Sequence, residues 1–230
     1  MHGLYFEVTS DFGHFRNPFT LSFFETFLAP PRTTILGLVG AALGLDESET
    51  IKLGDKLKVG VKILEIKGFA REIVTTFNYK VKPPERTPIM REILVNPTYR
   101  VYLGSEDKDL LKSIIEALKK PKYSLYMGIS EFLARVTKIS KLQKFDGVME
   151  KRFGCIVPIN GEYKVRVELD VGKSYFPPKI CKTVYSYEIT KKGRNPKKFI
   201  NLLMFLGYDV ELEKPIKAYK TEENEVICLL

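Results

Sequence analysis

The amino-acid sequence predicts an α+β fold. Over about the first 140 residues, apolar patterns typical of strands and helices follow the order strand, helix, strand, strand, helix, strand. This is the ferredoxin-like (RRM-like) arrangement, which RNA-recognition domains share with many unrelated proteins. Strand patterns dominate after about residue 145. We therefore predict a ferredoxin-like domain at 1–144 and a smaller β-rich subdomain at 145–230, in a chain of 230 residues that can bury a sizeable core.

The first two elements are a strand and a glycine-rich helix. The apolar run LYFEV predicts a buried strand at 4–8. After a basic loop, a second apolar run predicts a buried helix at 33–45, which Thr33 or Thr34 would cap. Its glycines are spaced by three and four residues, so they share one side of the helix and should let it pack closely on the sheet. They are Gly37, Gly40 and Gly44.

Later patterns complete the predicted domain. Alternating apolar and polar residues at 56–66 predict a half-buried strand, and further strands are expected at 71–81 and 91–95. The run DKDLLKSIIEALKK at 107–120 predicts an amphipathic helix, because its leucines and isoleucines fall on one face. A strand near 132–139 closes the series.

The last third of the chain is expected to be mainly β. The runs VRVEL at 165–169, TVYSYEI at 183–189 and EVICLL at 225–230 have the residue types of strands. The residues at 197–206 instead show a helical pattern. The sequence shows no internal repeat and no low-complexity linker.

Charge and composition limit the classes of binding partner that we expect for this protein. Lys and Arg exceed Asp and Glu by 37 to 28, and this excess favours nucleic acid, a membrane surface or an acidic protein. The apolar run at 35–45 is about half of the roughly 20 residues that a membrane helix needs, so we expect no membrane span. It also lacks the Gly-Lys-Ser/Thr of a phosphate-binding loop. Three widely spaced cysteines and the absence of a basic leader predict a cytoplasmic protein without disulfides, metal or cofactor.

Three motifs together resemble a known family. PPRTTILGLVGAALGL follows the first strand, REILVNPTYRVYLG precedes the second helix, and PKYSLYMGISEFLA follows it. In this order they resemble the CRISPR-associated RAMP superfamily, family five in the usual naming. Members of that family hold the five-prime handle of the guide RNA in type I Cascade complexes. The resemblance covers roughly residues 3–140 and is greatest with the type I-A and I-B branches.

The resemblance implies a fold, partners and a thumb. The family fold is a ferredoxin-like domain with a β subdomain, and a thumb inserted in the first domain closes over the RNA. The best thumb candidate lies at 69–98, whose proline-rich centre is excluded from a central strand. Implied partners are the guide RNA handle, the Cascade backbone subunit and the large subunit. Neither a membrane nor a small-molecule substrate is implied.

Candidate RNA-binding residues lie in five segments. Backbone amides at a helix start and arginine side chains suit phosphates, whereas splayed bases need stacking and contacts to their edges. For each residue a purely structural role, as a helix cap, a solvated loop residue or a core side chain, stays open. The candidates are Arg16, Arg32, Thr33, Thr34, Lys80, Lys82, Arg86, Arg91, Tyr126, Gly128, Lys191, Lys192 and Arg194.

Catalysis is not expected. One branch of the family cuts precursor guide RNA with histidine, lysine and tyrosine, and such acid–base cleavage needs no metal. This chain has only His2 and His14, and neither follows a lysine. We therefore expect a structural RNA-binding subunit. A metal-independent endoribonuclease and a ferredoxin-like assembly module without RNA binding are the alternatives.

Overall fold

The computed structural model describes residues 1–166, 174–191 and 193–230 and confirms an α+β protein. Its described part contains three helices and several antiparallel sheets. The helices are α1 (Arg32–Leu43), α2 (Glu47–Lys56) and α3 (Lys108–Lys119). None of these described helices is long and apolar enough to cross a bilayer.

The central sheet has the strand order β4 (Lys58–Glu65), β7 (Thr98–Ser105), β1 (His2–Thr9) and β8 (Arg135–Ile139), and its neighbours are antiparallel. The short β9 (Gln143–Lys144) also pairs with β1. Helices α1 and α3 pack together on one face, over a core that includes Phe6, Val101 and Ile114. The predicted strands at 4–8 and 56–66 and the predicted helix at 107–120 are confirmed. The strand expected near 132–139 begins at Arg135.

The chain itself covers the opposite face of this sheet. Tyr5 and Tyr102 sit on the two middle strands and pack with Phe145, Tyr219 and Ile227. The Tyr5 hydroxyl donates to Glu223, and the Tyr102 hydroxyl donates to Glu225. The C-terminal segment therefore closes the sheet face that an RNA-recognition domain would leave open.

Helix α1 differs from the prediction in how it starts and where its glycines point. Pro31 occupies the N-cap position and makes no side-chain cap hydrogen bond, so neither Thr33 nor Thr34 caps the helix. A Cβ on Gly40 would lie 2.3 Å from the Thr50 hydroxyl oxygen of α2. Gly37 meets no atom within 4 Å. The expectation that the glycines face the sheet is therefore wrong, because the close contact is between α1 and α2.

Helix α2 has no counterpart in the sequence-based prediction. The Asp46 carboxylate accepts from the Glu49 amide, while the Glu49 side chain accepts from the Asp46 amide, which is a capping box. That pattern is visible in the sequence DESE. The helix buries only Leu53 fully, so its weak apolar periodicity hid it.

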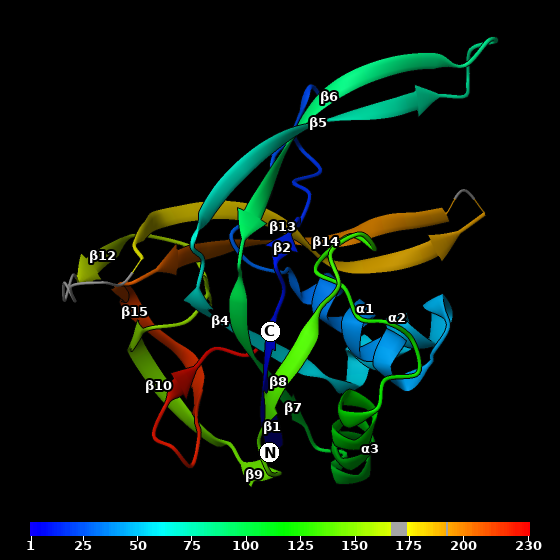
Figure 1. Cartoon of the computed structure of the whole chain (residues 1–230). Coiled ribbons are helices and arrows are strands. Elements are labelled where there is room, and N and C mark those ends of the chain that lie inside the picture. The colour runs from blue at the N-terminus through cyan, green and yellow to red at the C-terminus, as the bar shows by residue number, and fades with distance from the viewer. Residues whose placement is uncertain (167–173, 192) are drawn as a thin grey trace.

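The thumb candidate forms a long β-hairpin of β5 (Gly68–Asn78) and β6 (Glu85–Val95), which projects from the body at the top of Figure 1. Near its base, β6 also pairs with β2 (Phe12–Gly13) and β3 (Phe23–Phe24). Pro88 lies inside β6 opposite Thr75. The prolines are tolerated because this arm is two-stranded along most of its length, so they are indeed outside a central strand.

The C-terminal third is built from two further sheets. In one, β13 (Phe176–Thr190) and β14 (Gly193–Leu206) form a long hairpin, and β11 (Val157–Pro158) pairs with β14. The other joins β15 (Asp209–Lys220) to β10 (Asp146–Phe153), β12 (Tyr163–Arg166) and β16 (Val226–Ile227). The strand predicted at 165–169 falls partly on 167–169, which lies outside the described residues.

The helical pattern at 197–206 is wrong, because these residues belong to β14. Leu202 and Met204 enter the core under the central sheet, whereas Leu203 and Phe205 enter the core of the C-terminal sheets. A strand buried on both faces has no alternation of apolar and polar residues, so its sequence resembles a buried helix. The domain division at 144/145 stays a prediction.

Candidate functional site

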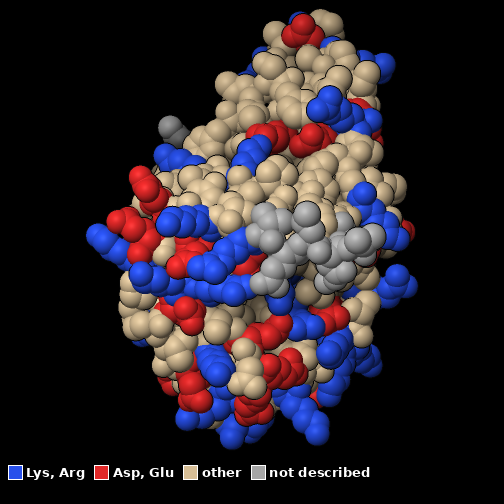
Figure 2. Space-filling model, turned by 90° about the vertical axis from the view of Figure 1, so that its left-hand side faces the viewer, with Lys and Arg blue, Asp and Glu red and all other residues tan. Residues whose placement is uncertain are grey.

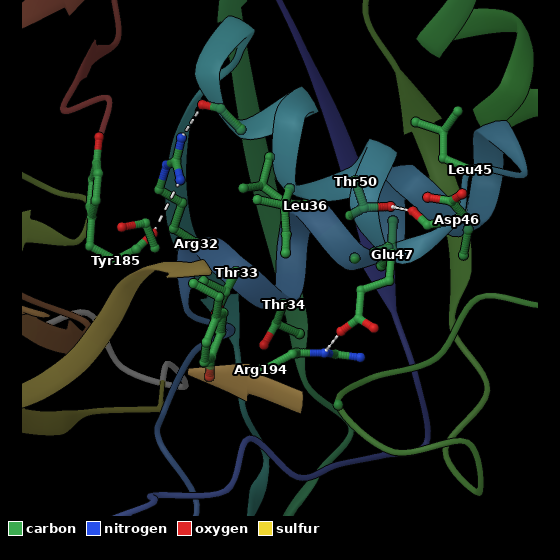
Figure 3. Close-up of a pocket in the computed structure, with 18 of the residues that line it drawn as sticks. Arg32, Thr33, Thr34, Leu36, Leu45, Asp46, Glu47, Thr50, Tyr185 and Arg194 are labelled. Carbon is green, nitrogen blue, oxygen red and sulfur yellow. Dashed lines mark hydrogen bonds and ion pairs between the residues drawn. The ribbon is translucent and has the colours of Figure 1, made fainter. Parts of the chain in front are cut away.

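A cleft of about 1140 Å³ opens between α1, α2, the segment 123–128 and the β13–β14 hairpin (Figure 3). It brings together predicted site residues from three distant parts of the sequence. They are Arg32, Thr33, Thr34, Tyr126, Gly128 and Arg194. Of the remaining predicted residues, Lys80, Lys82, Arg86 and Arg91 lie on the thumb, Arg16 lies in the loop after β2, and Lys191 lies at the turn of the β13–β14 hairpin.

Arg32 is largely buried beneath this cleft, with 7% of its surface exposed. Its guanidinium donates to four backbone carbonyls, those of Gly54, Leu57, Tyr185 and Leu230. It also lies 4.5 Å from the centre of the Tyr185 ring. Burial lowers the pKa of Arg32. These contacts favour a structural role for Arg32, because its donors are engaged by α2, β13 and the C-terminal segment, and its role in binding phosphate stays a prediction.

The other helix-entry and loop residues have mixed roles. Thr33 and Thr34 are partly exposed and line the cleft, as does the exposed Tyr126. Gly128 has a φ of 90°, and a Cβ there would lie 1.9 Å from the His14 carbonyl oxygen. The close approach expected at this glycine is therefore to the protein backbone rather than to a ligand.

The β14 side of the cleft is basic. Arg194 forms an ion pair with Glu47 of α2, which Figure 3 shows spanning the cleft. The Lys198 ammonium lies 4.7 Å from the Tyr185 ring centre. Lys191 is exposed at the hairpin turn, and Lys192 lies outside the described residues. The sequence around Arg194 contains no acid, so its partner Glu47, almost 150 positions away, could not be predicted.

A second surface lies on the thumb side of the β13–β14 hairpin. The Arg16 guanidinium lies 4.0 Å from the Phe24 ring centre. The Lys182 ammonium lies 5.5 Å from the Phe19 ring and 4.9 Å from the Phe199 ring. We call these five residues the thumb-side platform. Of these five residues, only Arg16 was predicted. The phenylalanine-rich run RNPFTLSFF at 16–24 could have indicated Phe19 and Phe24, whereas Lys182 and Phe199 join them only through the fold.

The thumb residues divide into an exposed tip and a tied base. Lys80 and Lys82 are exposed in the connection between β5 and β6. The Arg86 guanidinium lies 5.4 Å from the Phe77 ring centre. Arg91, by contrast, pairs with Glu72 at 2.7 Å and with Glu131 at 2.8 Å, and its side chain is only 13% exposed.

The guanidinium of Arg91 is therefore paired with two carboxylates. Burial opposes its charge, but hydrogen bonds to Glu131 and Glu72 outweigh burial and raise the pKa of Arg91. Glu131 belongs to the loop before β8, so this arginine joins the thumb to the body. These two ion pairs leave Arg91 without a free charge for RNA, and its role as an RNA-binding residue stays a prediction.

The charge distribution is uneven across the molecule. Figure 2 shows Lys, Arg, Asp and Glu interspersed on the face that carries β10, β12 and β15. Several of them are paired there, including Arg152 with Asp209 and Arg166 with Glu211. The platform and the β14 side of the cleft are better candidates for an anionic ligand.

The histidines are poorly placed for acid–base chemistry. His14 is 3% exposed, and its Nδ1 lies 2.8 Å from the Glu92 carbonyl oxygen. Burial lowers the pKa of His14. His2 begins β1, and the residues that line the described cleft include neither histidine.

Comparison with known protein families gives the class of this molecule. The family model described as "CRISPR-associated protein (Cas_Cas5)" matches residues 3–184. The chain therefore belongs to the Cas5 family of CRISPR-associated proteins, and the resemblance stated from its sequence motifs is confirmed. No curated protein matches the chain.

Two of the solved structures similar to this chain share its fold. One titled as a CRISPR protein from Archaeoglobus fulgidus is 17% identical, with a TM-score of 0.60 over 99% of this chain and 98% of that one. A chain of a structure titled "CRISPR RNA-guided surveillance complex" is 12% identical, with a TM-score of 0.54 over 97% and 92%. A third, titled "Crystal structure of Cas protein", is 26% identical over 56% of this chain and 57% of its own, with a TM-score of 0.41.

Proposed function

We propose that this Cas5-family chain is a structural RNA-binding subunit of a type I CRISPR surveillance complex (Cascade). In this role it holds the five-prime handle of the guide RNA and contacts the backbone and large subunits in antiviral defence. The observation that carries the proposal is the thumb-side platform. Family membership, and a fold shared with a chain of an RNA-guided surveillance complex, support the assignment.

The platform has the chemistry that single-stranded RNA requires. Such RNA is bound by cations along its backbone and by aromatic rings on which its bases stack. Phe19 and Phe199 are 51% and 41% exposed, and Lys182 lies over both rings. In the described part of the chain, neither Lys182 nor Arg16 has a carboxylate partner, so both charges are available to phosphates. The thumb adds Arg86 over Phe77.

The topology supports binding at the platform rather than on the sheet. The strand order β8-β1-β7-β4, with helices after the first and third of these strands in sequence, supports the ferredoxin-like assignment for the N-terminal part. The C-terminal segment covers the outer face of that sheet, over Tyr5 and Tyr102. The outer face of the sheet is therefore not open to RNA, which favours binding at the platform and the thumb.

We further propose that the chain does not cut RNA. A general acid or base must come within hydrogen-bonding reach of the scissile group, and the buried His14 ring is turned toward the Glu92 carbonyl. Precursor repeat RNA incubated with the purified protein in chelator should stay intact. Specific cleavage that disappears in His14→Ala would establish the endoribonuclease alternative instead.

The test of RNA binding is a titration of handle-bearing RNA over a series of salt concentrations. Lys182→Ala should weaken binding about tenfold, because charge-assisted contacts are worth about 1.5–3 kcal/mol. It should also reduce the slope of log affinity against log salt by about 0.7. Lys112→Ala is the matched control, since that lysine pairs with Asp109 on α3 at the opposite end of the molecule from the thumb (Figure 1).

Two results would contradict the proposal. Equal effects of Lys182→Ala and Lys112→Ala would show that the platform is not the contact surface. Wild-type protein that assembles with its protein partners but shows no salt-dependent RNA affinity would favour the assembly-module alternative.

A further inference from the structure

We infer that the cleft between α1, α2 and β14 receives one unstacked nucleotide of the bound RNA, whose phosphate replaces Glu47 as the ion-pair partner of Arg194. This inference rests on the proposed function and deepens it, because it assigns a ligand class and a competing side chain to a second site.

The cleft can hold a flat ring. Its volume of about 1140 Å³ exceeds that of a single nucleotide, and four tyrosines line it, Tyr123, Tyr126, Tyr185 and Tyr187. Helix α1 contributes an open floor at Gly37, where even a Cβ would meet no atom within 4 Å. A base taken out of a single strand is typically held between aromatic or apolar side chains of this kind.

The charges of the cleft favour an anion. Each of its carboxylates already has a role in the described structure: Asp46 caps α2, Asp55 lies near enough to favour the charged form of Arg32, and Glu47 pairs with Arg194. Lys197 and Lys198 are exposed on the cleft wall and have no carboxylate partner among the described residues. The surplus charge at the mouth is therefore positive.

The pair of Glu47 and Arg194 spans the cleft and can exchange. The two side chains are 47% and 64% exposed, and ion pairs this exposed contribute little stability. A phosphate offers Arg194 a bidentate acceptor of higher charge than a carboxylate, so it can displace Glu47. Glu47 thus acts as a competitor that the RNA must replace.

Strand β14 connects the cleft with the thumb-side platform. Lys198 points toward the Tyr185 ring at the cleft, whereas its neighbour Phe199 contacts Phe19 on the platform. Successive residues of a strand face opposite sides, so one strand presents both surfaces. An RNA strand bound on the platform can therefore place one nucleotide across the β13–β14 hairpin and into the cleft.

The experiment uses the full chain and a series of short single-stranded RNAs, each with one fluorescent 2-aminopurine at a different position. One position should be strongly quenched on binding, and Tyr126→Leu should relieve that quenching. Glu47→Gln should tighten RNA binding about two- to fivefold, because it removes the competitor. Arg194→Ala should weaken binding about tenfold. Glu116→Gln, which removes the acid of an exposed pair with Lys119 on α3, is the control and should have no effect.

The outcomes separate this inference from the proposed function. If wild-type protein binds RNA with the expected salt dependence but the cleft variants behave like the control, the cleft inference is overturned and the proposed function stands. If wild-type protein binds no RNA, both are overturned. If the cleft variants keep full RNA affinity but lose a purified partner subunit, the cleft is a protein-docking site and the inference is again overturned.

Discussion

Replacing Arg32 with alanine should destabilise the protein severely. The substitution removes a buried cation that donates to carbonyls of α2, β13 and the C-terminal segment. Hydrogen bonds from a charged group contribute about 1.5–3 kcal/mol each, but bonds that share one side chain are not additive. Loss of one partner from a buried charged network typically costs about 3–5 kcal/mol, and we expect a value in this range.

Urea denaturation of Arg32→Ala measures this cost. The midpoint should fall without a change in slope, and the thermal midpoint should fall by roughly 10 °C for a chain of this size. Arg32→Lys should be intermediate, because one ammonium cannot reach all four carbonyls. Arg194→Ala is the matched control, since that arginine is exposed, and its effect should stay within about 0.5 kcal/mol. An Arg32→Ala protein as stable as wild type, with weakened RNA binding, would refute the structural role and restore a direct RNA contact.

Two further predictions concern stability. Gly40→Leu should lower the free energy of unfolding by about 1–3 kcal/mol, because a Cβ at this position would lie 2.3 Å from the Thr50 hydroxyl oxygen. Gly37→Ala should be neutral or stabilise the protein by up to about 1 kcal/mol. Equal melting temperatures of these two variants would contradict the packing of α1 on α2. Burial opposes the charge of Glu225, but hydrogen bonds from Lys62, Tyr102 and Arg100 prevail and lower the pKa of Glu225 to about 2. The ion therefore stabilises the fold above its ordinary pKa of about 4.5, and about 3 kcal/mol should be lost as the pH falls from about 4.5 toward 2. The stability difference between wild type and Glu225→Gln should shrink over that range, and a constant difference would show that Glu225 is not the titrating group.

The sequence alone determined the α+β class of the fold and several of its elements, but it did not predict α2 or the strands β7, β10 and β15. Local periodicity reports burial directly, so the strand at 4–8 and the helix at 107–120 follow from the pattern of apolar residues. Motif order was equally informative, because it identified the family that the comparison confirmed. The sequence also contains a signal for helix α2, which was not predicted: the capping-box residues Asp46 and Glu49.

Periodicity failed where two cores share one strand. Apolar residues at 202–206 are buried on both sides of β14, and only the position of the C-terminal sheets shows that each side has its own core. The glycines of α1 show the same limit. Their spacing indicates a close contact, but whether Gly40 meets the sheet or α2 depends on where α2 packs.

The tertiary structure alone decided which basic residues face solvent. Arg32 and Arg194 look alike in sequence, yet one is surrounded by carbonyls from distant segments and the other closes a cleft with Glu47. The platform likewise forms only because Phe19 meets Lys182 and Phe199, more than 160 positions away. A charge is available to a ligand if the fold leaves it exposed, either without a partner or in an ion pair that can exchange. Both depend on contacts that no local pattern of residues encodes.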